Sequence, residues 1–149
     1  MATATGKLYG NGLLACLNGG VIWGSDDVYL ALASSSYTVD IDAHDFWNDV
    51  NGSYEVTGTN WSAGGVQADG ETLSLVGASD RIEFDITDES TSTVTLSDGK
   101  HLIVYTRTPG TDGTRELIGY ATFDTALAPA GGTLLLDFST SGFVYIGYA

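Results

Sequence analysis

The chain has 149 residues, of which 43% are hydrophobic and 16% are charged, and this balance excludes an intrinsically disordered protein. Nineteen acidic residues against five basic ones give a net charge of −14, so the chain lacks the basic face that DNA or RNA binding requires. Its apolar runs are far shorter than the roughly 20 residues of a membrane-spanning helix. We therefore expect a single domain, residues 1–149, that binds neither nucleic acid nor a membrane.

The first twenty residues predict an arm followed by a helix. Residues 1–7 are small and polar, so we expect an extended N-terminal arm there. Leu13, Leu14 and Leu17 then have helical spacing, and Gly19 closes the segment, which predicts a short helix that ends in glycine. No basic segment followed by an apolar one opens the chain, so we expect no signal peptide. We therefore expect the protein to be made in a reducing cytoplasm.

Most of the remaining chain has the patterns of β-strands separated by turns. Apolar or alternating segments predict eight to ten strands, at residues 26–34, 54–59, 71–76, 81–86, 92–97, 101–107, 115–123, 133–138 and 143–148. The pair Asp98-Gly99 predicts a hairpin between its flanking strands. Together these segments are typical of a mostly β protein, an antiparallel β-sandwich or jelly-roll-like domain with one or two short helices.

Individual strands also predict which side chains are buried. In "RIEFDI", residues 81–86, apolar and charged residues alternate. We expect Ile82, Phe84 and Ile86 in the core, and Glu83 and the other charged residues on the surface. The strands at 133–138 and 143–148 carry apolar residues on both faces, so we expect them to be covered on both sides. Cys16 lies in an apolar run, which is typical of a buried and inert thiol.

The acidic stretch "DIDAHDFWNDV", residues 40–50, has two interpretations. Asp40, Asp42, His44 and Asp45 are weak candidates for a metal site, because carboxylates and imidazole are common metal ligands. Their spacing matches no specific metal-binding loop, however, so we expect no bound metal.

The favoured interpretation of the same stretch is a short capped helix. Asp42 is a good N-cap, and an aspartate three residues later lies in the first turn, where the helix dipole favours negative charge. Phe46 and Val50 are four residues apart and would share one helical face. Asn51-Gly52 provides the end of the helix.

No catalytic pattern stands out in the sequence. The only two histidines are His44 and His101, and His101 is expected to be exposed at the start of a strand. Neither a nucleophile elbow nor a phosphate-binding loop is present, so we expect no enzymatic activity and no cofactor. Trp23, Trp47 and Trp61 could stack on sugars, but in small β domains such residues usually fill the core.

Two parts of the sequence resemble a family of small virion proteins of tailed bacteriophages. The first is residues 9–66, with "LNGG", "SYTVDIDAHDFWNDV" and "EVTGTNWSAGG", and the second is "LIVYTRTPGTDGTRELIGYATFD", residues 102–124. This resemblance implies a mostly β, non-catalytic structural protein, located on the head as decoration or in the tail. The acidity favours the outer surface of the head, because the inner surface faces packaged DNA.

From the resemblance we expect a capsid decoration, or cement, protein on the outer surface of the phage head, made in the host cytoplasm. Its expected partners are the phage major capsid protein and further copies of itself, in a homo-oligomer such as a trimer. The expected contacts lie in the N-terminal arm and beside the loop 108–115, at Met1, Ala2, Thr3, Ala4, Thr5, Lys7, Arg107 and Arg115. The alternatives are a tail or baseplate component, a carbohydrate-binding host-attachment module and, more remotely, a small hydrolase.

Overall fold

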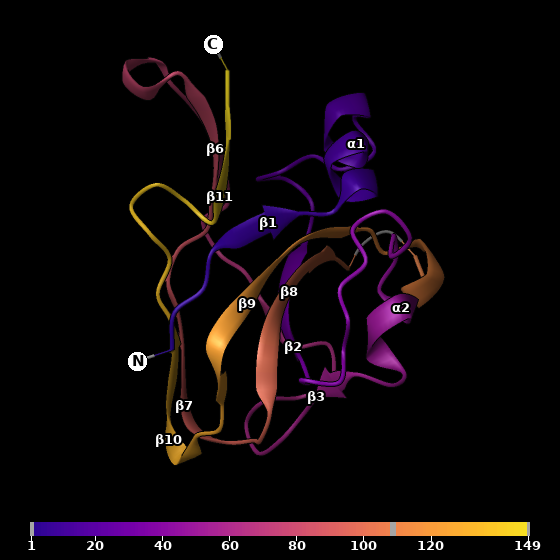
Figure 1. The fold of residues 1–149 in the computed structure, drawn as a ribbon, viewed down its shortest axis with the longest axis vertical. Helices are drawn as coiled ribbons and strands as arrows, with labels where there is room; N and C mark the ends of the chain where they lie inside the picture. The colour runs from indigo at the N-terminus through magenta and orange to yellow at the C-terminus, as the bar shows by residue number, and fades with distance from the viewer. Residues whose placement is uncertain (1, 108–109, 149) are drawn as a thin grey trace.

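The structure, a computed structural model, describes residues 2–107 and 110–148, and in them the expected mostly β fold is confirmed. Antiparallel strands form three sheets in a sandwich-like arrangement (Figure 1). The strands are β1 Gly6–Leu8, β2 Val28–Ala33, β3 Glu55–Val56, β4 Val66–Gln67, β5 Thr72–Val76, β6 Arg81–Asp85, β7 Glu89–Thr95, β8 Gly99–Thr106, β9 Leu117–Leu127, β10 Ala130–Leu136 and β11 Val144–Gly147. The helices are α1 Gly10–Asn18, α2 Asn48–Asn51 and two 3₁₀ turns, Gly77–Ser79 and Asp112–Thr114.

The largest sheet forms the middle layer of the protein. Its strand order is β1-β9-β8-β2-β3, and β4 also pairs with β2. The strand β2 is buried on both faces: Leu30 and Leu32 enter one core, whereas Ala31 and Ala33 enter a second core on the opposite face. This two-sided burial explains why the sequence of β2 is apolar at every position.

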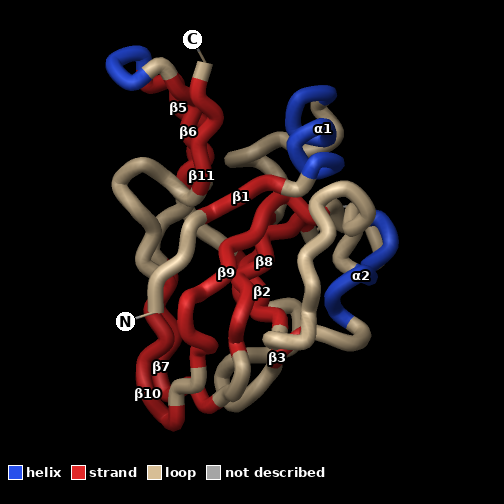
Figure 2. The backbone as a smooth tube through the Cα atoms, in the orientation of Figure 1, coloured by secondary structure: helices blue, strands red, loops and turns tan. Residues whose placement is uncertain are grey.

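An antiparallel ribbon covers the first of these cores. Its lower part is β7 paired with β10, and its upper part is β6 paired with β11, with β5 added at the edge (Figures 1 and 2). Val94, Leu134 and Leu136 of the lower part are buried in the first core. The second core is covered instead by the segment around α2, which contributes Trp47 and Val50.

The predicted hairpin at Asp98-Gly99 is wrong. Asp98 has the left-handed φ of 62° that a tight turn favours, but the flanking strands do not pair with each other. Instead β7 pairs with β10, and β8 pairs with β2 and β9. The turn therefore carries the chain from the ribbon to the central sheet, where β8 is buried on both faces.

The prediction that the last two strands are covered on both sides is also wrong. Leu135 of β10 is 49% exposed and Tyr145 of β11 is 56% exposed. These strands belong to the outer layer, so only one face of each packs against the core.

In β6 the predicted register is confirmed for the apolar residues but not for Glu83. Phe84 is buried, whereas Glu83, which was expected on the surface, is only 9% exposed. Its carboxylate accepts a hydrogen bond of 2.6 Å from Nε of Arg81. Because β6 is the middle strand of its sheet, Ser74 of β5 and Tyr145 of β11 flank Glu83 on both sides and cover it.

The predicted first helix is confirmed as α1, and Gly19 ends it with a left-handed φ of 80°. The helix packs on β9 through its small residues: Gly12 and Ala15 are buried, and a Cβ added to Gly12 would lie 2.2 Å from the carbonyl oxygen of Leu117. The side chains of Leu14 and Leu17 consequently point outward and are 57% and 75% exposed. Neither helix among the described residues is long and apolar enough to span a membrane.

Candidate functional site

The acidic stretch forms a loop whose carboxylates bond to backbone amides. One oxygen of Asp40 accepts hydrogen bonds from the amides of Asp42, at 3.1 Å, and Ala43, at 3.0 Å. One oxygen of Asp49 accepts from the amides of Asp45, at 3.0 Å, and Phe46, at 3.1 Å. These two carboxylates therefore stabilise two consecutive turns.

The prediction that Asp42 caps the helix is wrong. The helix α2 begins only at Asn48, and Trp47 occupies the N-cap position without a capping side-chain bond. The segment before it instead pairs with the residues just before β9: the amide of Trp47 donates to the carbonyl of Arg115, and Phe46 forms an isolated bridge with Glu116. This pairing keeps Phe46 extended, so it does not share a helical face with Val50, although the helix does end at Asn51.

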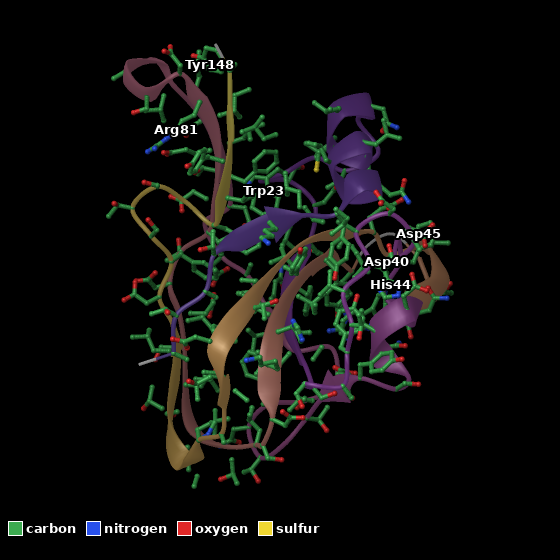
Figure 3. The ribbon with its side chains drawn as sticks, in the orientation of Figure 1. Trp23, Asp40, His44, Asp45, Arg81 and Tyr148 are labelled. Atoms are coloured by element: carbon green, nitrogen blue, oxygen red, sulfur yellow. The ribbon has the colours of Figure 1, made fainter. Side chains whose placement is uncertain are left out.

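The candidate metal ligands do not form a metal cluster in the structure. Figure 3 places Asp40, His44 and Asp45 in the loop beside α2. Nδ1 of His44 lies 2.8 Å from the hydroxyl of Tyr37, so this ring nitrogen is already bonded. In residues 2–107 and 110–148 no group of three or more histidine, cysteine or acidic side chains is placed to hold a metal ion.

The loop lies over a buried cluster of aromatic side chains on the second face of the central sheet. The hydroxyls of Tyr9 and Tyr37 lie 3.0 Å apart, and the rings of Trp47 and Tyr105 stack with their centroids 4.1 Å apart. Burial raises the pKa of Tyr37 to about 12 and that of Tyr105 to about 12. These hydroxyls stay protonated at neutral pH, which suits them to packing and hydrogen bonding.

His101 belongs to the same cluster, so the prediction that it is exposed is wrong. It is 8% exposed, Nδ1 lies 2.9 Å from the hydroxyl of Thr122, and its ring packs edge-on against Tyr37. Burial lowers the pKa of His101 below its ordinary value of 6.5. It lies inside β8, where seven of the eight residues are buried, and Tyr37 from the loop after β2 covers its ring.

The N-terminal residues, predicted as an extended arm, are extended but bonded to their own chain. Gly6 to Leu8 form β1, which pairs with β9. Before it, Thr3 donates from its amide and its hydroxyl to the carboxylate of Asp124, at 3.1 and 3.0 Å. Backbone pairing therefore orders a segment that has few large side chains; Met1 lies outside the described residues.

The arm residues and the two arginines predicted as contacts do not come together. Lys7 lies on the edge strand β1, exposed and opposite Tyr120. Arg107 follows the end of β8 and Arg115 precedes the start of β9. There Nε of Arg115 donates to the carbonyl of Arg107 at 3.0 Å. Arg107 also lies over the ring of Tyr29, 4.6 Å from its centroid. Thr108 and Pro109 of the predicted contact loop lie outside the described residues.

All three tryptophans are buried. Trp23, Trp47 and Trp61 are 8%, 2% and 1% exposed, so none presents a ring face on which a sugar could stack. Trp23 instead contacts the ring of Phe84 edge-on, and its Nε1 donates to the carbonyl of Thr72 at 3.0 Å. These contacts anchor the outer ribbon to the loop that follows α1, as the position of Trp23 in Figure 3 illustrates.

A pocket of about 760 Å³ lies between the N-terminal segment and the outer ribbon. Residues 2–6 form one wall, and Phe123, Phe138 and Phe143 contribute much of its apolar lining. Hydrogen bonds from Thr3 to Asp124 hold the N-terminal wall in place. The pocket is thus a gap between layers that the N-terminal segment partly closes.

The most unusual surface feature is a group of exposed apolar side chains, which we call the apolar pole. It consists of six residues on α1, the loop after it, β5 and the end of the chain: Leu14, Leu17, Ile22, Leu73, Leu75 and Tyr148. Figure 1 shows α1 and the ribbon of β6 and β11 at the same end of the long axis, and Figure 2 adds β5 there. Large exposed apolar side chains that lie near one another are typical of a binding surface, and Leu14, Leu17 and Ile22 lie within nine residues of one another on and just after α1.

Sequence reasoning missed the apolar pole. The signal in α1 is the pair Gly12 and Ala15, whose small side chains allow close packing and so turn Leu14 and Leu17 outward. In β5 the signal is an apolar strand without a charged residue in a strongly acidic chain.

Comparison with protein-family models, with curated proteins and with solved structures finds no match to this chain.

Proposed function

We propose that this protein is a non-catalytic virion component that binds the outer surface of a bacteriophage head and stabilises the assembled shell. The resemblance of residues 9–66 and 102–124 to small tailed-phage virion proteins supports the choice of a virion. The part of the apolar pole on and just after α1, formed by Leu14, Leu17 and Ile22, is the observation on the molecule that carries the docking part of the proposal, and its partner there is the phage major capsid protein.

Binding alone would produce the stabilisation. Each fully buried leucine or isoleucine contributes about 1.5–3 kcal/mol. Leu14 and Leu17 on the outer face of α1, together with Ile22 in the loop after it, therefore supply enough apolar surface for a stable contact. A copy that touches two coat subunits makes their separation more costly, because its own contacts must break as well. Many copies on one shell multiply this effect.

The charge of the protein supports the outer rather than the inner surface. With a net charge of −14, many copies inside the head would be repelled by the phosphates of packaged DNA. On the outside the same charge keeps the particles soluble and limits non-specific association. Charged residues at the rim of the contact would set orientation more than affinity.

A binding isotherm on heads stripped of this protein tests the proposal. Leu17→Ser, on α1, should weaken binding about tenfold, which corresponds to about 1.4 kcal/mol. The matched control is Leu135→Ser, another exposed leucine, which lies on β10 outside the apolar pole and should bind like the unchanged protein. Decorated shells should also survive a heat challenge that ruptures bare shells.

The possible results separate the proposal from its alternatives. If the unchanged protein bound isolated tails and not heads, the head assignment would fall and a tail or baseplate role would replace it. If heads bound the Leu17→Ser variant as tightly as the unchanged protein, α1 would have no part in docking.

A further inference from the structure

The strand β5 is an open sheet edge without the usual protection. It is the outermost strand of the sheet β11-β6-β5, and among residues 2–107 and 110–148 it pairs only with β6. Residues 72–75 are all exposed, and the pairing with β6 runs over five residues without a bulge. Proteins normally protect such edges with lysine, proline, a bulge or a covering loop, and the sequence "TLSLV" of β5 contains no charge and no proline.

The hydrogen bonds of β6 show which of its backbone groups face β5. The carbonyl of Phe84 accepts a bond of 2.8 Å from the amide of Phe143, on the side of β11. Backbone groups of successive residues in a strand point to opposite sides. Those of Glu83 therefore point toward β5, where its partner is Ser74.

The same alternation leaves the backbone of Leu73 and Leu75 unpaired. Because the N–H and C=O of Ser74 point toward β6, those of Leu73 and Leu75 point away from it, to the open edge. No described residue forms a backbone hydrogen bond with them. Trp23 holds the start of the strand through its bond to the Thr72 carbonyl, so the open edge belongs to an anchored strand.

This edge is complementary to itself. If two copies of β5 meet antiparallel with Ser74 opposite Ser74, then Leu73 of each copy faces Leu75 of the other. Each of the two Leu73–Leu75 pairs then exchanges two backbone hydrogen bonds. The N–H and C=O groups of Leu73 and Leu75, four in each strand, all gain a partner. If the pairing were centred on Leu73, Leu75 would have to pair with Glu71, whose carbonyl oxygen lies against Gly24. If it were centred on Leu75, Leu73 would have to pair with Gly77, which is in a 3₁₀ turn.

The side chains favour the same pairing. Leu73 and Leu75 lie in the register rows of Phe84 and Ile82 of β6, so they share the apolar face of this sheet and would meet leucines of the second copy. They are 54% and 72% exposed in the single chain. The five residues of β5 carry no charge in a chain of net charge −14, so the strand itself adds no like-charge repulsion, and salt screens the rest.

We propose that β5 pairs with β5 of a second copy across a two-fold axis at Ser74, which joins the two three-stranded sheets into one sheet of six strands. This pairing is independent of the proposed function, because it involves only copies of this chain. It commits the protein to a dimer as the unit of self-association, and higher assemblies would be built from dimers.

Disulfide trapping tests the register directly. Directly opposite residues of a pair that is not hydrogen-bonded have Cα atoms about 4.5 Å apart, within the range that a disulfide spans. In a Cys16→Ala background, Ser74→Cys should therefore form a cross-linked dimer under mild oxidation. Thr72→Cys and Val76→Cys are the matched controls: each alone should stay uncross-linked, whereas a mixture of the two should cross-link, because Thr72 faces Val76 of the other copy.

Sedimentation velocity at physiological salt tests the association itself. The unchanged protein should form a dimer at high concentration, and Leu75→Lys should raise the dimer dissociation constant at least tenfold. Leu135→Lys, with an exposed leucine on β10 changed in the same way, should leave it unchanged, and circular dichroism should show that both variants are folded. A protein that stays monomeric, or cross-linking that is equal at positions 72, 74 and 76, would overturn the pairing.

Discussion

At the scale of single residues, the acidic loop shows how carboxylates act in this protein. Asp49 bonds to two backbone amides, those of Asp45 and Phe46, whereas no described residue hydrogen-bonds to the carboxylate of Asp42. Asp49→Ala should therefore lower the free energy of unfolding by about 1 kcal/mol, as the loss of a cap does. Asp42→Ala should change it by less than about 0.5 kcal/mol, and urea unfolding of the two variants checks both values. Equal losses would contradict the role of Asp49.

Replacing the neighbouring residues Phe84 and Glu83 should lower the free energy of unfolding by different amounts. Phe84→Ala removes a buried ring that contacts Trp23 and should cost about 3–5 kcal/mol. Glu83→Ala leaves Arg81 without its ion-pair partner in a half-buried setting and should cost about 1–2 kcal/mol.

The control for Glu83→Ala is Glu83→Gln, which keeps an oxygen that can accept from Arg81 and should recover part of the loss. Thermal unfolding of the three variants tests this ranking. If Glu83→Ala left the midpoint unchanged, Glu83 would behave as a surface residue, as the alternation of its strand alone suggests.

At the scale of elements, α1 depends on close contact with β9. A Cβ at Gly12 would collide with the backbone at Leu117 and Ile118, so Gly12→Ala should destabilise the protein by about 1–3 kcal/mol through overpacking. An alanine normally stabilises a helix relative to glycine, so the sign of this effect is informative. Gly52→Ala, at the end of α2 where the added methyl group meets no atom within 4 Å, is the control and should be neutral or slightly stabilising. Denaturant midpoints of both variants decide the point.

The elements also mark what could be predicted from the sequence. Local patterns identified β2, β6 and α1, because alternation and a terminal glycine depend only on nearby residues. The partners of each strand were not predictable in this way: Asp98-Gly99 indicates a turn, but the burial of β8 decides that the turn joins two layers. Likewise Glu83 is covered by strands from distant parts of the sequence. The apolar pole was missed because the outward direction of Leu17 depends on how α1 packs.

At the scale of the whole molecule, burial of acidic groups shapes the dependence of stability on pH. Burial raises the pKa of Glu55 and Glu116 above the ordinary value of 4.5, and it does the same for Glu71 and Glu89. The folded protein then binds protons more readily than the unfolded chain, so its stability increases as pH falls from 7 toward 4.5. The reduced negative charge acts in the same direction.

His101 opposes this trend, because its lowered pKa means that the folded protein loses stability as pH falls below 6.5. With four glutamates against one histidine, the urea midpoint should rise between pH 7 and about pH 5. Glu55→Gln combined with Glu116→Gln should flatten the rise. A midpoint that fell steadily over the same range would contradict this account of the buried carboxyls.

The central claim about the whole molecule is that it decorates the outside of a phage head. Electron cryomicroscopy of phage particles that carry this protein, compared with particles that lack it, tests that claim most directly. We expect the difference density to repeat over the outer surface of the head, and each unit to have the size of this domain or of its β5-paired dimer. Difference density confined to the tail, or absent from the virion, would contradict the claim.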